Sequence, residues 1–533
     1  MKILIAEKIN EDGLKYLREE GFDVDIKIGM TPDELLTVIG DYDAIIVRSA
    51  TKVISEVVEK GTNLKVVGRA GNGIDNIDVP ACTKKGIMVV NTPESNIMAA
   101  AELAVAHAYA LFRNIPQAYY AGKKKDFRRN NFVGAELDGK TAGIIGFGRI
   151  GGIVASKLKG INMKVVAYDP FVTAERFEQA GVTKCETIDE LLAQSDLVTI
   201  HTPKIAGGGI IGAKQLAICK KGARIVNCAR GGLIDEKALY VALKSGHIAG
   251  VALDVLEKEP NFNKAPEDQD YTNPLFELDN VIYTPHLGAS TNEANYNVGV
   301  AIAKIVGEGL NGEMVPAVNM PPLKGTNMQK LKPYIDLAES LGKIFYQAEK
   351  GPVTKIEVIY SGDLVEKDTR VISLSALKGL LASAASENVN YVNVEMIAKN
   401  MGIELLEGKS SMIDKYTNLI TIKFYTKEKE YSVAGTVFAK EEIRIVDFFG
   451  YKLDFEPTPY IVAIQNMDKP GIIGKIGTVL GLAGINIAAM QWSRNKHNGK
   501  AVAFVSIDAD ITQQIIDDLI NIEGVVKASL LKF

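Results

Sequence analysis

Short apolar runs alternate with longer segments that we assign to helices over residues 1 to 96. Turn residues bound each apolar run, and runs of this length rich in Val and Ile are typical of buried strands. The predicted strands are 2–6, 24–28, 44–48, 65–69 and 88–91. Because strand and helix alternate, we expect a parallel sheet covered by helices.

The same alternation returns later in the chain. The alanine-rich stretch 97–112, interrupted by Glu102 and His107, predicts a long buried helix, and the basic segment 123–129 follows it. Further strands are predicted at 141–145, 164–168, 197–201, 224–228, 250–255 and 281–283, with helices at 153–158 and 293–310. We expect the last helix to return to the first domain. The fold class is therefore α/β, with two Rossmann-like doubly wound domains: a flavodoxin-like domain of residues 1–96 and 290–315, and a second of residues 97–289.

Prolines mark two further boundaries. Pro316, Pro321 and Pro322 indicate a linker, and 456–459 indicates a second one. Residues 317–455 predict an α+β domain, with strands at 419–425, 431–438 and 443–449. Residues 459–533 predict a ferredoxin-like βαββαβ module, with strands 460–465, 486–492, 501–507 and 525–531 and helices 471–483 and 512–522.

Composition excludes several classes of protein. A hydrophobic content of 47%, a charged content of 24% and a net charge of −4 are ordinary globular values, and without a long basic run we expect no nucleic acid. The stretch 97–112 is too short and too interrupted to span a bilayer, and residues 1–7 lack the apolar core of a signal peptide, so we expect no membrane. Four cysteines without a CxxC pair suggest reduced thiols in the cytoplasm and no metal site.

A glycine-rich loop follows the predicted strand 141–145. In Gly146-Phe147-Gly148-Arg149-Ile150-Gly151, the first glycine allows a tight turn, the second lets backbone approach a pyrophosphate, and the third permits close packing of helix on strand. The helix N-terminus offers free N–H groups to phosphates. The motif alone also occurs in chance glycine-rich turns, so its context decides.

Asp169 supplies that context. It ends the strand 164–168, where an acidic residue accepts hydrogen bonds from the ribose hydroxyls and its charge repels a 2′-phosphate. The combination of strand, loop, helix, strand and acid predicts a dinucleotide site that takes NAD rather than NADP.

Later strands of the same domain also end in polar groups. His201 and Thr202, Cys228 to Arg230, Asp254 and His286 follow four of these strands. Ligands bind at the carboxyl edge of open α/β sheets, so we expect these residues to line one crevice.

Hydride transfer to a nicotinamide from a hydroxyl-bearing carbon needs a proton acceptor and a cation. His286, in a Pro-His-Leu-Gly turn, is the predicted acceptor, and Glu259 would stabilise the imidazolium formed. Arg230, between strand and glycines, can bind a carboxylate with its donor fork. Taken singly, a loop histidine is more often structural, and residues 257–259 read as a solvated loop.

Two more arginines end strands of the first domain. Arg48 and Arg69 would lie on one sheet edge and suggest an anionic group on the substrate. Arg128 and Arg129 are the other basic candidates, although a charge run is usually a solvated face.

These motifs together are recognisable. Residues 1–315 resemble the D-isomer-specific 2-hydroxyacid dehydrogenases, through Val47-Arg48-Ser49-Ala50-Thr51, Gly68-Arg69-Ala70-Gly71, Asn227-Cys228-Ala229-Arg230-Gly231-Gly232 and His286-Leu287-Gly288-Ala289. Within that family the chain is similar to the branch that oxidises 3-phospho-D-glycerate as the first step toward L-serine. Residues 317–455 resemble the intervening, allosteric substrate-binding-like domain of its long form, and 459–533 resemble an ACT domain.

The resemblance implies roles for individual residues. It makes Arg230, Glu259 and His286 the catalytic set, Arg48 and Arg69 the substrate-phosphate site, with Arg129 added as the other basic candidate, and Asn466, Asp468 and Asn486 an L-serine effector site. It also favours a homo-oligomer, with a tetramer for the long form, and the alanine-rich helix 97–112 suits a packed interface. The implied NAD contacts are Asn72, Gly146, Gly148, Arg149, Ile150, Gly151, Asp169, Thr202, Cys228, Ala229, Arg230, Asp254, His286, Leu287, Gly288 and Ala289.

Two departures from the family and two alternative functions stay open. Asn72 stands where several relatives carry threonine, and the segment between Glu259 and His286 looks longer than in close relatives, so the Glu–His contact must survive the extra loop. The substrate could be another D-2-hydroxy acid, such as 2-hydroxyglutarate, glycerate or lactate. A non-enzymatic NAD(H)-sensing scaffold is the alternative from another class, and the presence of Arg230 with Glu259 and His286 counts against it.

Overall fold

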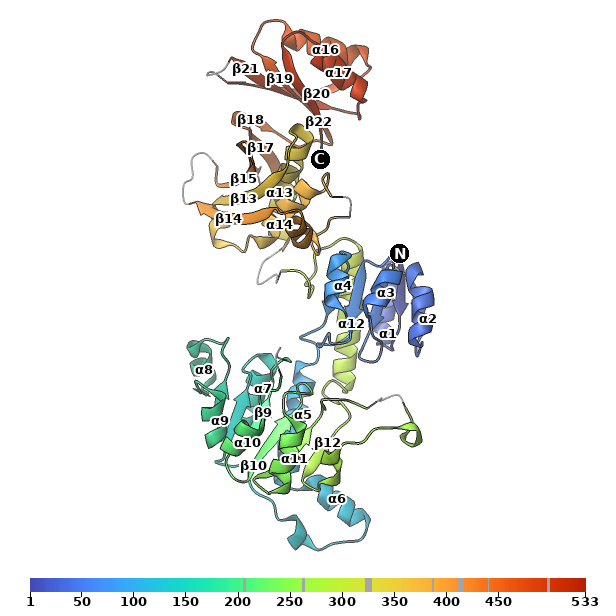
Figure 1. Cartoon of the computed structure of the whole chain (residues 1–533), viewed down its shortest axis with the longest axis vertical. Helices are drawn as coiled ribbons and strands as arrows, with labels where there is room; N and C mark the ends of the chain where they lie inside the picture. Colours follow the sequence, from blue (N-terminus) through green and yellow to red (C-terminus); the bar gives the residue numbers. More distant parts are fainter. Residues whose placement is uncertain are drawn as a thin grey trace.

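The computed structural model describes residues 1–533 except 205–207, 261–263, 322–327, 386–387, 411–415, 440 and 496–498. The chain is elongated, with its four sheets arranged along the long axis (Figure 1). The first sheet lies in the middle, the second below it, and the third and fourth above it. Pro322 of the predicted linker and residues 261–263 of the loop before His286 lie outside the described residues.

The first sheet is five-stranded and parallel, with the order β2-β1-β3-β4-β5, which is the predicted flavodoxin-like arrangement. Its strands are β1 (Lys2–Ile5), β2 (Asp23–Ile26), β3 (Ala44–Val47), β4 (Val66–Arg69) and β5 (Met88–Asn91). Helices α1 (Glu11–Glu19) and α12 (Asn292–Leu310) cover one face, and α2 (Pro32–Val38), α3 (Ser55–Lys60) and α4 (Val79–Lys84) cover the other. The helix after the second sheet therefore does return to the first.

Burial on both faces explains the sequence pattern of these strands. Ile3 and Ile5 of β1 pack toward α1 and α12, whereas Leu4 packs toward the opposite helices. Since both sides of the strand are covered, it reads as a continuous apolar run rather than an alternating one.

The second sheet is seven-stranded and parallel, with the order β12-β11-β10-β9-β6-β7-β8. Its strands are β6 (Thr141–Ile145), β7 (Lys164–Tyr168), β8 (Thr183–Lys184), β9 (Leu197–Ile200), β10 (Ala223–Asn227), β11 (Ile248–Leu253) and β12 (Val281–Tyr283). The order reverses between β6 and β9, which creates the crevice in which α/β proteins bind ligands. Strand β8 is too short to leave a sequence pattern, and we did not predict it.

Helices cover both faces of this sheet. Helix α5 (Ile97–Phe112) packs with α7 (Arg149–Gly160) on one face, while α9 (Ile188–Gln194), α10 (Ala213–Ile218) and α11 (Glu236–Lys244) cover the other. The helix α8 (Ala174–Ala180) follows β7. One face of α5 packs within its own chain, whereas Met98 and Tyr109 on this helix are exposed, so the predicted interface stays a prediction.

One helix of this region was not predicted. Helix α6 (Ile115–Lys123) begins after Asn114, whose φ of 48° places it in the left-handed region and turns the chain between α5 and α6. None of the residues of α6 is buried, so it lacks the apolar stripe that identifies a helix in sequence.

The third sheet is six-stranded and mixed, with the order β14-β13-β15-β16-β17-β18. Only the β13–β14 pair is parallel in it. Helices α13 (Met328–Ala348) and α14 (Arg370–Leu381) pack against the sheet and each other, and α15 (Val394–Asn400) packs on α14. The strands are β13 (Val353–Gly362), β14 (Glu404–Ser410), β15 (Asn418–Thr426), β16 (Glu430–Phe438), β17 (Glu442–Phe448) and β18 (Tyr451–Phe455). Strands β14 and β18 lie at the edges of the sheet and were not predicted; β14 is mainly polar, and β18 alternates apolar with charged residues.

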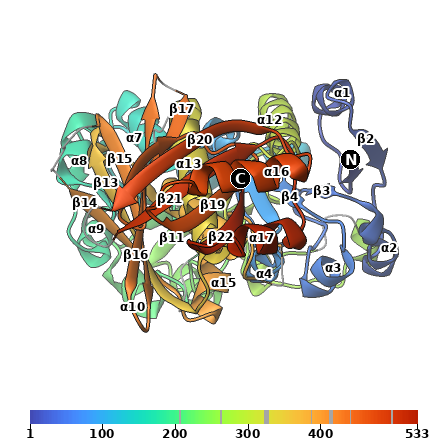
Figure 2. The same ribbon diagram turned by 90° about the horizontal axis from the view of Figure 1, so that it is seen from above.

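The fourth sheet is antiparallel, with the order β20-β21-β19-β22. Its elements are β19 (Tyr460–Met467), α16 (Ile472–Leu482), β20 (Ile487–Asn495), β21 (Lys500–Ile507), α17 (Gln513–Ile520) and β22 (Val525–Lys532). From above, this sheet lies over the middle of the molecule, with α2 and α3 to one side and α8 and α9 to the other (Figure 2). The order and connections are those of a ferredoxin-like module, so the predicted fold class is confirmed throughout.

The segment leaving the first sheet is bound to it before the third sheet begins. The backbone N–H of Val318 donates to the carbonyl of Val89 at 2.7 Å, and the Asn319 amide oxygen accepts from the N–H of Val89 at 2.9 Å. Residues 318 and 319 therefore run along β5. In the part of the chain that the structure describes, no helix is long and apolar enough to cross a membrane.

Candidate active site

The glycine loop joins β6 to α7 in a conformation that needs its glycines. Gly146 has φ of 93°, and a Cβ there would lie 2.5 Å from the carbonyl oxygen of His201. A Cβ on Gly151 would lie 2.1 Å from the carbonyl oxygen of Gly146, whereas Gly148 faces open space. Helix α7 begins at Arg149, four residues before the predicted start, so Ile150 stands in its first turn. The N–H groups of this turn and the open backbone at Gly148 form a place for a pyrophosphate.

Asp169 lies beside this loop. Its two carboxylate oxygens accept from the backbone N–H groups of Phe147, at 2.8 Å, and Phe171, at 2.9 Å. These bonds fix the carboxylate at the end of β7, where a ribose would lie. Arg149 forms an exposed ion pair with Glu94 at 2.7 Å.

The ends of β9 and β10 provide the facing wall. The hydroxyl oxygen of Thr202 is buried without a hydrogen-bond partner among the described residues. His201 bonds to the hydroxyl of Thr199 at 2.9 Å, and burial lowers the pKa of His201 to about 4, so its ring is neutral near pH 7. Burial, helped by the charge of Asp254, raises the pKa of the Cys228 thiol. Uncharged groups with one unsatisfied hydroxyl are suited to a neutral part of a ligand.

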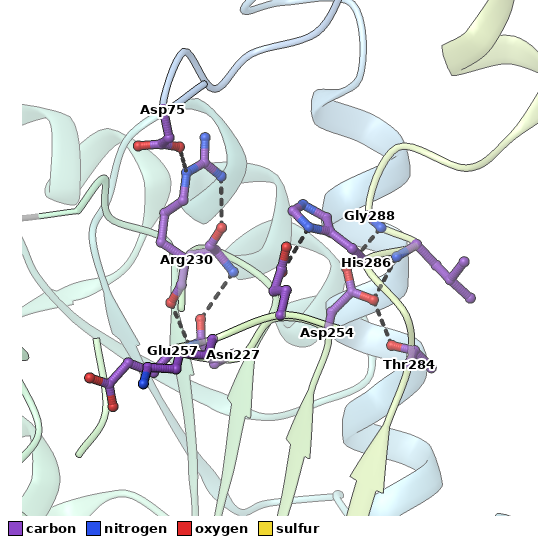
Figure 3. A network of polar contacts seen from close by, with 12 residues as sticks. Asp75, Asn227, Arg230, Asp254, Glu257, Thr284, His286 and Gly288 are labelled. Atoms are coloured by element: carbon purple, nitrogen blue, oxygen red, sulfur yellow. Dashed lines mark hydrogen bonds and ion pairs between the residues drawn. The ribbon is translucent and has the colours of Figure 1, made fainter. Parts of the chain in front are cut away.

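Arg230 reaches across from the second sheet to the first domain. Its Nε lies 3.3 Å from a carboxylate oxygen of Asp75, and its Nη1 donates to the carbonyl of Ala229 at 2.7 Å (Figure 3). A Cβ on Gly73 would lie 2.4 Å from Nη2, so the glycine leaves room for the guanidinium. The side chain of Asn227 donates to the carbonyl of Arg230 at 2.9 Å and holds the loop in place.

Arg48 and Arg69 lie near this cation. An Arg48 Nη donates to the amide oxygen of Asn295 on α12 at 2.8 Å. The Nε of Arg69 is buried with no partner within the described ranges, and burial together with the charges of Arg230 and Arg48 lowers the pKa of Arg69 to about 10. The structure thus brings three guanidinium groups together, and the charges of Glu7 and Asp75 offset their mutual repulsion at Arg69 only in part, which favours an anion site.

Arg129 does not join them in one copy of the chain. It begins the short 3-10 helix Arg129–Phe132, is exposed, and its segment packs beside α6 at the outer end of the second sheet (Figure 1). Arg128 forms an ion pair with Asp126 at 2.6 Å. The basic segment is exposed in a single chain, and the assignment of Arg129 to the phosphate site stays a prediction.

His286 and Glu259 meet despite the longer segment between them. The Nδ1 of His286 lies 2.9 Å from a carboxylate oxygen of Glu259. The backbone just before Glu259 is held in place: the Tyr271 hydroxyl donates to the carbonyl of Lys258 at 2.6 Å, and the backbone N–H of Glu257 donates to Glu236 at 2.6 Å. A carboxylate accepts hydrogen bonds, so Nδ1 carries the ring hydrogen and Nε2 is the basic nitrogen of the neutral ring.

The turn that carries His286 is tied to Asp254. The carboxylate of Asp254 is fully buried and accepts from the backbone N–H groups of Leu287, at 2.7 Å, and Gly288, at 2.8 Å, as well as from the hydroxyl of Thr284 at 2.6 Å (Figure 3). Ala289 completes the turn. The described contacts of Asp254 are therefore with the turn, and a direct contact with a cofactor stays a prediction.

Several polar partners at this site were missed from sequence. Asp75, Asn295 and Glu236 stand in no motif, Thr284 was given no role of its own beside His286, and His107 was assigned only to an apolar helix. Nothing short of the tertiary structure places them beside a motif residue. At Asn72 the described contact is the backbone carbonyl, which accepts from the side chain of Asn91 at 2.6 Å.

The three predicted effector residues are not neighbours within one chain. Asn466 is buried in β19, and Asp468 pairs with Arg494 at 3.3 Å. Asn486 donates to Asp508 at 2.5 Å at the other end of the sheet, because Asn466 is opposite Ala501 whereas Ile487 is opposite Ile507. The strand rise puts about 20 Å between those two positions, so no single-chain pocket contains all three.

Comparison with known proteins agrees with this architecture. Residues 105–288 match the NAD-binding domain of the D-isomer-specific 2-hydroxyacid dehydrogenases, 330–449 match the intervening domain of D-3-phosphoglycerate dehydrogenase, and 460–524 match the ACT domain. The D-3-phosphoglycerate dehydrogenase of Methanocaldococcus jannaschii is 43% identical over 529 residues, covering 98% of both chains. That of Bacillus subtilis is 39% identical and covers 99% of both.

The solved structures show the same core. A D-lactate dehydrogenase from Aquifex aeolicus, complexed with NAD and lactic acid, has a TM-score of 0.53 and 28% identity. It covers 59% of this chain and 96% of its own. The similarity therefore spans the two parallel-sheet domains and leaves the third and fourth sheets outside.

Proposed function

The chain belongs to the D-3-phosphoglycerate dehydrogenases, a branch of the D-isomer-specific 2-hydroxyacid dehydrogenases, and we propose that its crevice oxidises 3-phospho-D-glycerate to 3-phosphohydroxypyruvate with NAD, the first step toward L-serine. The observation that carries this proposal is the convergence of Arg48, Arg69 and Arg230 in the domain crevice that also holds the His286–Glu259 pair. A substrate with two anionic ends and a hydroxyl between them matches that set of groups.

His286 takes the proton of the substrate hydroxyl. Its Nε2 is the basic nitrogen because Nδ1–H is directed at Glu259. When Nε2 receives the proton, the ring becomes an imidazolium, and the carboxylate 2.9 Å away stabilises that charge. Glu259 also fixes the ring plane, so the proton acceptor is oriented before substrate arrives.

Arg230 binds the substrate carboxylate and polarises the carbonyl that forms. Its guanidinium is planar, offers two parallel N–H donors and is already directed at a carboxylate, that of Asp75. Asp75 is on the exposed rim, so a substrate carboxylate can replace it as the partner of Arg230.

Arg48 and Arg69 bind the phosphate. The charge on buried Arg69 is costly in the free protein, as its lowered pKa shows, and a phosphate would remove both the repulsion and the unsatisfied Nε. Asn295 on α12 accepts a hydrogen bond from one Nη of Arg48 at 2.8 Å and so holds that side chain.

The cofactor residues fit NAD. Gly146, Gly148 and the first turn of α7 bind the pyrophosphate. The Asp169 carboxylate accepts hydrogen bonds from the ribose hydroxyls and would repel a 2′-phosphate. The bound nicotinamide would supply the chemistry of the reaction by accepting the hydride from the substrate carbon. Thr202, with its unsatisfied hydroxyl, and neutral His201 form the wall beside it.

Regulation and assembly extend the proposal. The fourth sheet belongs to the ACT family, and we propose L-serine as its effector, bound between two copies of the chain because Asn466 and Asp468 lie at one end of the sheet and Asn486 at the other. A homo-oligomer, a tetramer by family resemblance, meets this requirement. Exposed apolar residues around α6 support an interface there: Ile115, Tyr119, Tyr120, Phe127 and Val133. All four cysteines are free, as expected of a protein kept in the reducing cytoplasm.

The test is NADH production by the purified chain with 3-phospho-D-glycerate, D-glycerate, D-lactate and D-2-hydroxyglutarate. We expect the phosphorylated substrate to give the highest kcat/KM by at least about 10²-fold, because a buried guanidinium left without its anion costs several kcal/mol. A higher kcat/KM for an unphosphorylated acid would show that this acid, and not 3-phospho-D-glycerate, is the substrate. If none of the four acids gave NADH, the NAD(H)-sensing alternative would be favoured over an enzyme.

A further inference from the structure

A buried chain of hydrogen bonds runs from α5 to the turn that carries His286. His107, in the middle of α5, is 4% exposed, and its Nε2 lies 3.0 Å from the hydroxyl oxygen of Thr284. The same oxygen lies 2.6 Å from a carboxylate oxygen of Asp254. The hydrogen bonds therefore link His107 to Thr284 and Thr284 to Asp254.

The direction of each bond follows from counting hydrogens. Both carboxylate oxygens of Asp254 accept backbone N–H groups, those of Leu287 and Gly288, and a carboxylate that accepts on both oxygens has no hydrogen to give. The hydroxyl of Thr284 must donate to Asp254, and its oxygen can then only accept from His107. The hydrogen of the His107 ring is thus on Nε2, an assignment made from the network.

His107 is well suited to donate permanently. Burial lowers its pKa while the charge of Asp254 opposes the shift, so the ring stays neutral near pH 7 with one hydrogen to give. Hydrogen bonds in series polarise one another, so a donor at the start of the chain strengthens the bond from Thr284 to Asp254.

The chain ends on a backbone that needs support. His286 has φ of 56°, in the left-handed region that residues with a Cβ seldom occupy. The N–H of His286 donates to the carbonyl of Asp254 at 3.0 Å, and the next two N–H groups donate to the carboxylate. Asp254 therefore binds three successive N–H groups of the turn, one through its carbonyl and two through its carboxylate, and the carbonyl of Thr284 also accepts from the N–H of His286 at 2.8 Å. Backbone strain of this kind persists only where the surroundings fix it.

We propose that His107 is a positioning residue for the oxidation, acting through Thr284 and Asp254 on the left-handed turn of His286. This inference rests on the proposed function, since it concerns the aim of the group that takes the hydroxyl proton. The bland alternative is a buried histidine that merely satisfies its own hydrogen bond and fills space. A positioning role predicts that a variant without the His107 N–H donor turns over more slowly, whereas a space-filling role does not.

The variants separate donor from volume. His107→Leu keeps an apolar side chain of similar size in α5 and removes the donor, whereas His107→Gln returns an N–H near the position of Nε2. We expect His107→Leu to lower kcat about five- to tenfold, the effect of one buried hydrogen bond, with KM for NAD and for 3-phospho-D-glycerate within twofold of wild type. His107→Gln should recover kcat to within about threefold of wild type.

Thr284 provides an independent check of the path. Thr284→Val, which keeps the shape, should lower kcat at least as much as His107→Leu, and Thr284→Ser should not. The double variant His107→Leu/Thr284→Val should be no slower than Thr284→Val alone, because both changes interrupt the same chain. Multiplying losses in the double variant would mean that the two residues act separately and would overturn the proposal.

Two further outcomes would also overturn it. His107→Leu that folds with an unchanged melting temperature and turns over like wild type shows that His107 has no part in positioning. Equal losses for His107→Leu and His107→Gln, with KM raised, show a packing role. The proposed function fails separately, by lack of NADH from the wild type, and ¹⁵N-histidine spectra then still test the chain: a neutral His107 carrying its hydrogen on Nδ1 contradicts it.

Discussion

A carboxylate oxygen of Glu259 lies 2.9 Å from Nδ1 of His286, which is 27 positions further along the chain. The Tyr271 hydroxyl donates to the carbonyl of Lys258, and the N–H of Glu257 donates to Glu236, so the backbone just before Glu259 is fixed. The carboxylate sets the tautomer of the ring, and the tautomer decides which nitrogen faces a proton to be removed.

Loss of either member of this pair should affect turnover differently. We expect His286→Ala to lower kcat by about 10²-fold or more, the usual range for a general base, with NAD affinity little changed. Glu259→Gln should lose about tenfold, because the ring keeps a hydrogen-bond partner but the imidazolium loses a charge. Steady-state kinetics checks both, with Glu257→Gln, two residues earlier on the same exposed segment, as the control. A folded His286→Ala with wild-type turnover contradicts the mechanism.

The arginine pair should distinguish substrates. Arg48→Gln and Arg69→Gln should each lower kcat/KM for 3-phospho-D-glycerate by about 10²-fold, and for D-glycerate by less than about threefold, because only the first substrate places an anion between them. Arg18→Gln, an exposed arginine on α1, is the control. Equal losses on both substrates would mean that the two arginines only hold the fold.

Asp169 should decide between the two dinucleotides. Asp169→Ser removes the charge facing a 2′-phosphate, and we expect the preference for NAD over NADP in kcat/KM to fall by about 10²-fold. Glu175→Gln, an exposed acid on α8, should leave the ratio unchanged. If Asp169→Ser keeps the full preference for NAD over NADP, another residue discriminates between the two cofactors at the ribose.

Acid should destabilise the fold through His201. Its pKa is lowered from 6.5 to about 4 in the folded chain, so between those pH values the unfolded chain binds the proton and the folded chain does not. Stability is therefore complete above about pH 6.5 and falls as the pH drops toward 4. The free energy of unfolding, measured with urea, should fall between pH 7 and pH 5 in both proteins. The fall should be about 1–2 kcal/mol smaller for His201→Gln than for wild type, a figure that allows for the partly exposed ring. Parallel pH curves for the two proteins would contradict this.

Serine inhibition should need residues from two copies of the chain. Asp468→Ala and Asn486→Ala should each abolish inhibition by millimolar L-serine while leaving basal turnover unchanged, and Asn521→Ala, exposed after α17, should not. Mixed oligomers of Asp468→Ala and Asn486→Ala should restore partial inhibition. In such an oligomer, one shared serine site receives an unchanged Asp468 from one copy and an unchanged Asn486 from the other. Wild type that is not inhibited by L-serine contradicts the effector assignment, and failed restoration contradicts the shared site.

The motifs were readable from sequence because each depends on a few consecutive residues. The glycine loop, Asp169 at the end of β7, and the arginines after β3, β4 and β10 all follow from strand patterns and from what glycine or a guanidinium can do at a strand end. The doubly wound order and the ferredoxin-like module followed from the same alternation of elements.

Other features could not be read in this way. Helix α6 has no buried face and β14 carries few apolar residues, so neither leaves a periodic signal. Strand β18 does alternate apolar and charged residues, but over only five positions, and this pattern was missed. Arg129 was assigned to the phosphate site by charge alone; in one chain its segment contacts α6, and its role stays a prediction. The alanine-rich helix α5 suggested an interface; one face of it packs within its own chain while Met98 and Tyr109 are exposed, so the interface stays a prediction.

By itself, then, the sequence determined the order of elements, the cofactor loop and the residue types of the chemistry, because these are written in local spacing. Tertiary structure decided which side chains meet. It brought Glu259 to His286, aligned His107 and Thr284 with Asp254, and gathered three arginines whose repulsion only a folded crevice creates. Such contacts join residues far apart in the chain, and their distances are set by how sheets and helices pack rather than by any property of the neighbouring sequence.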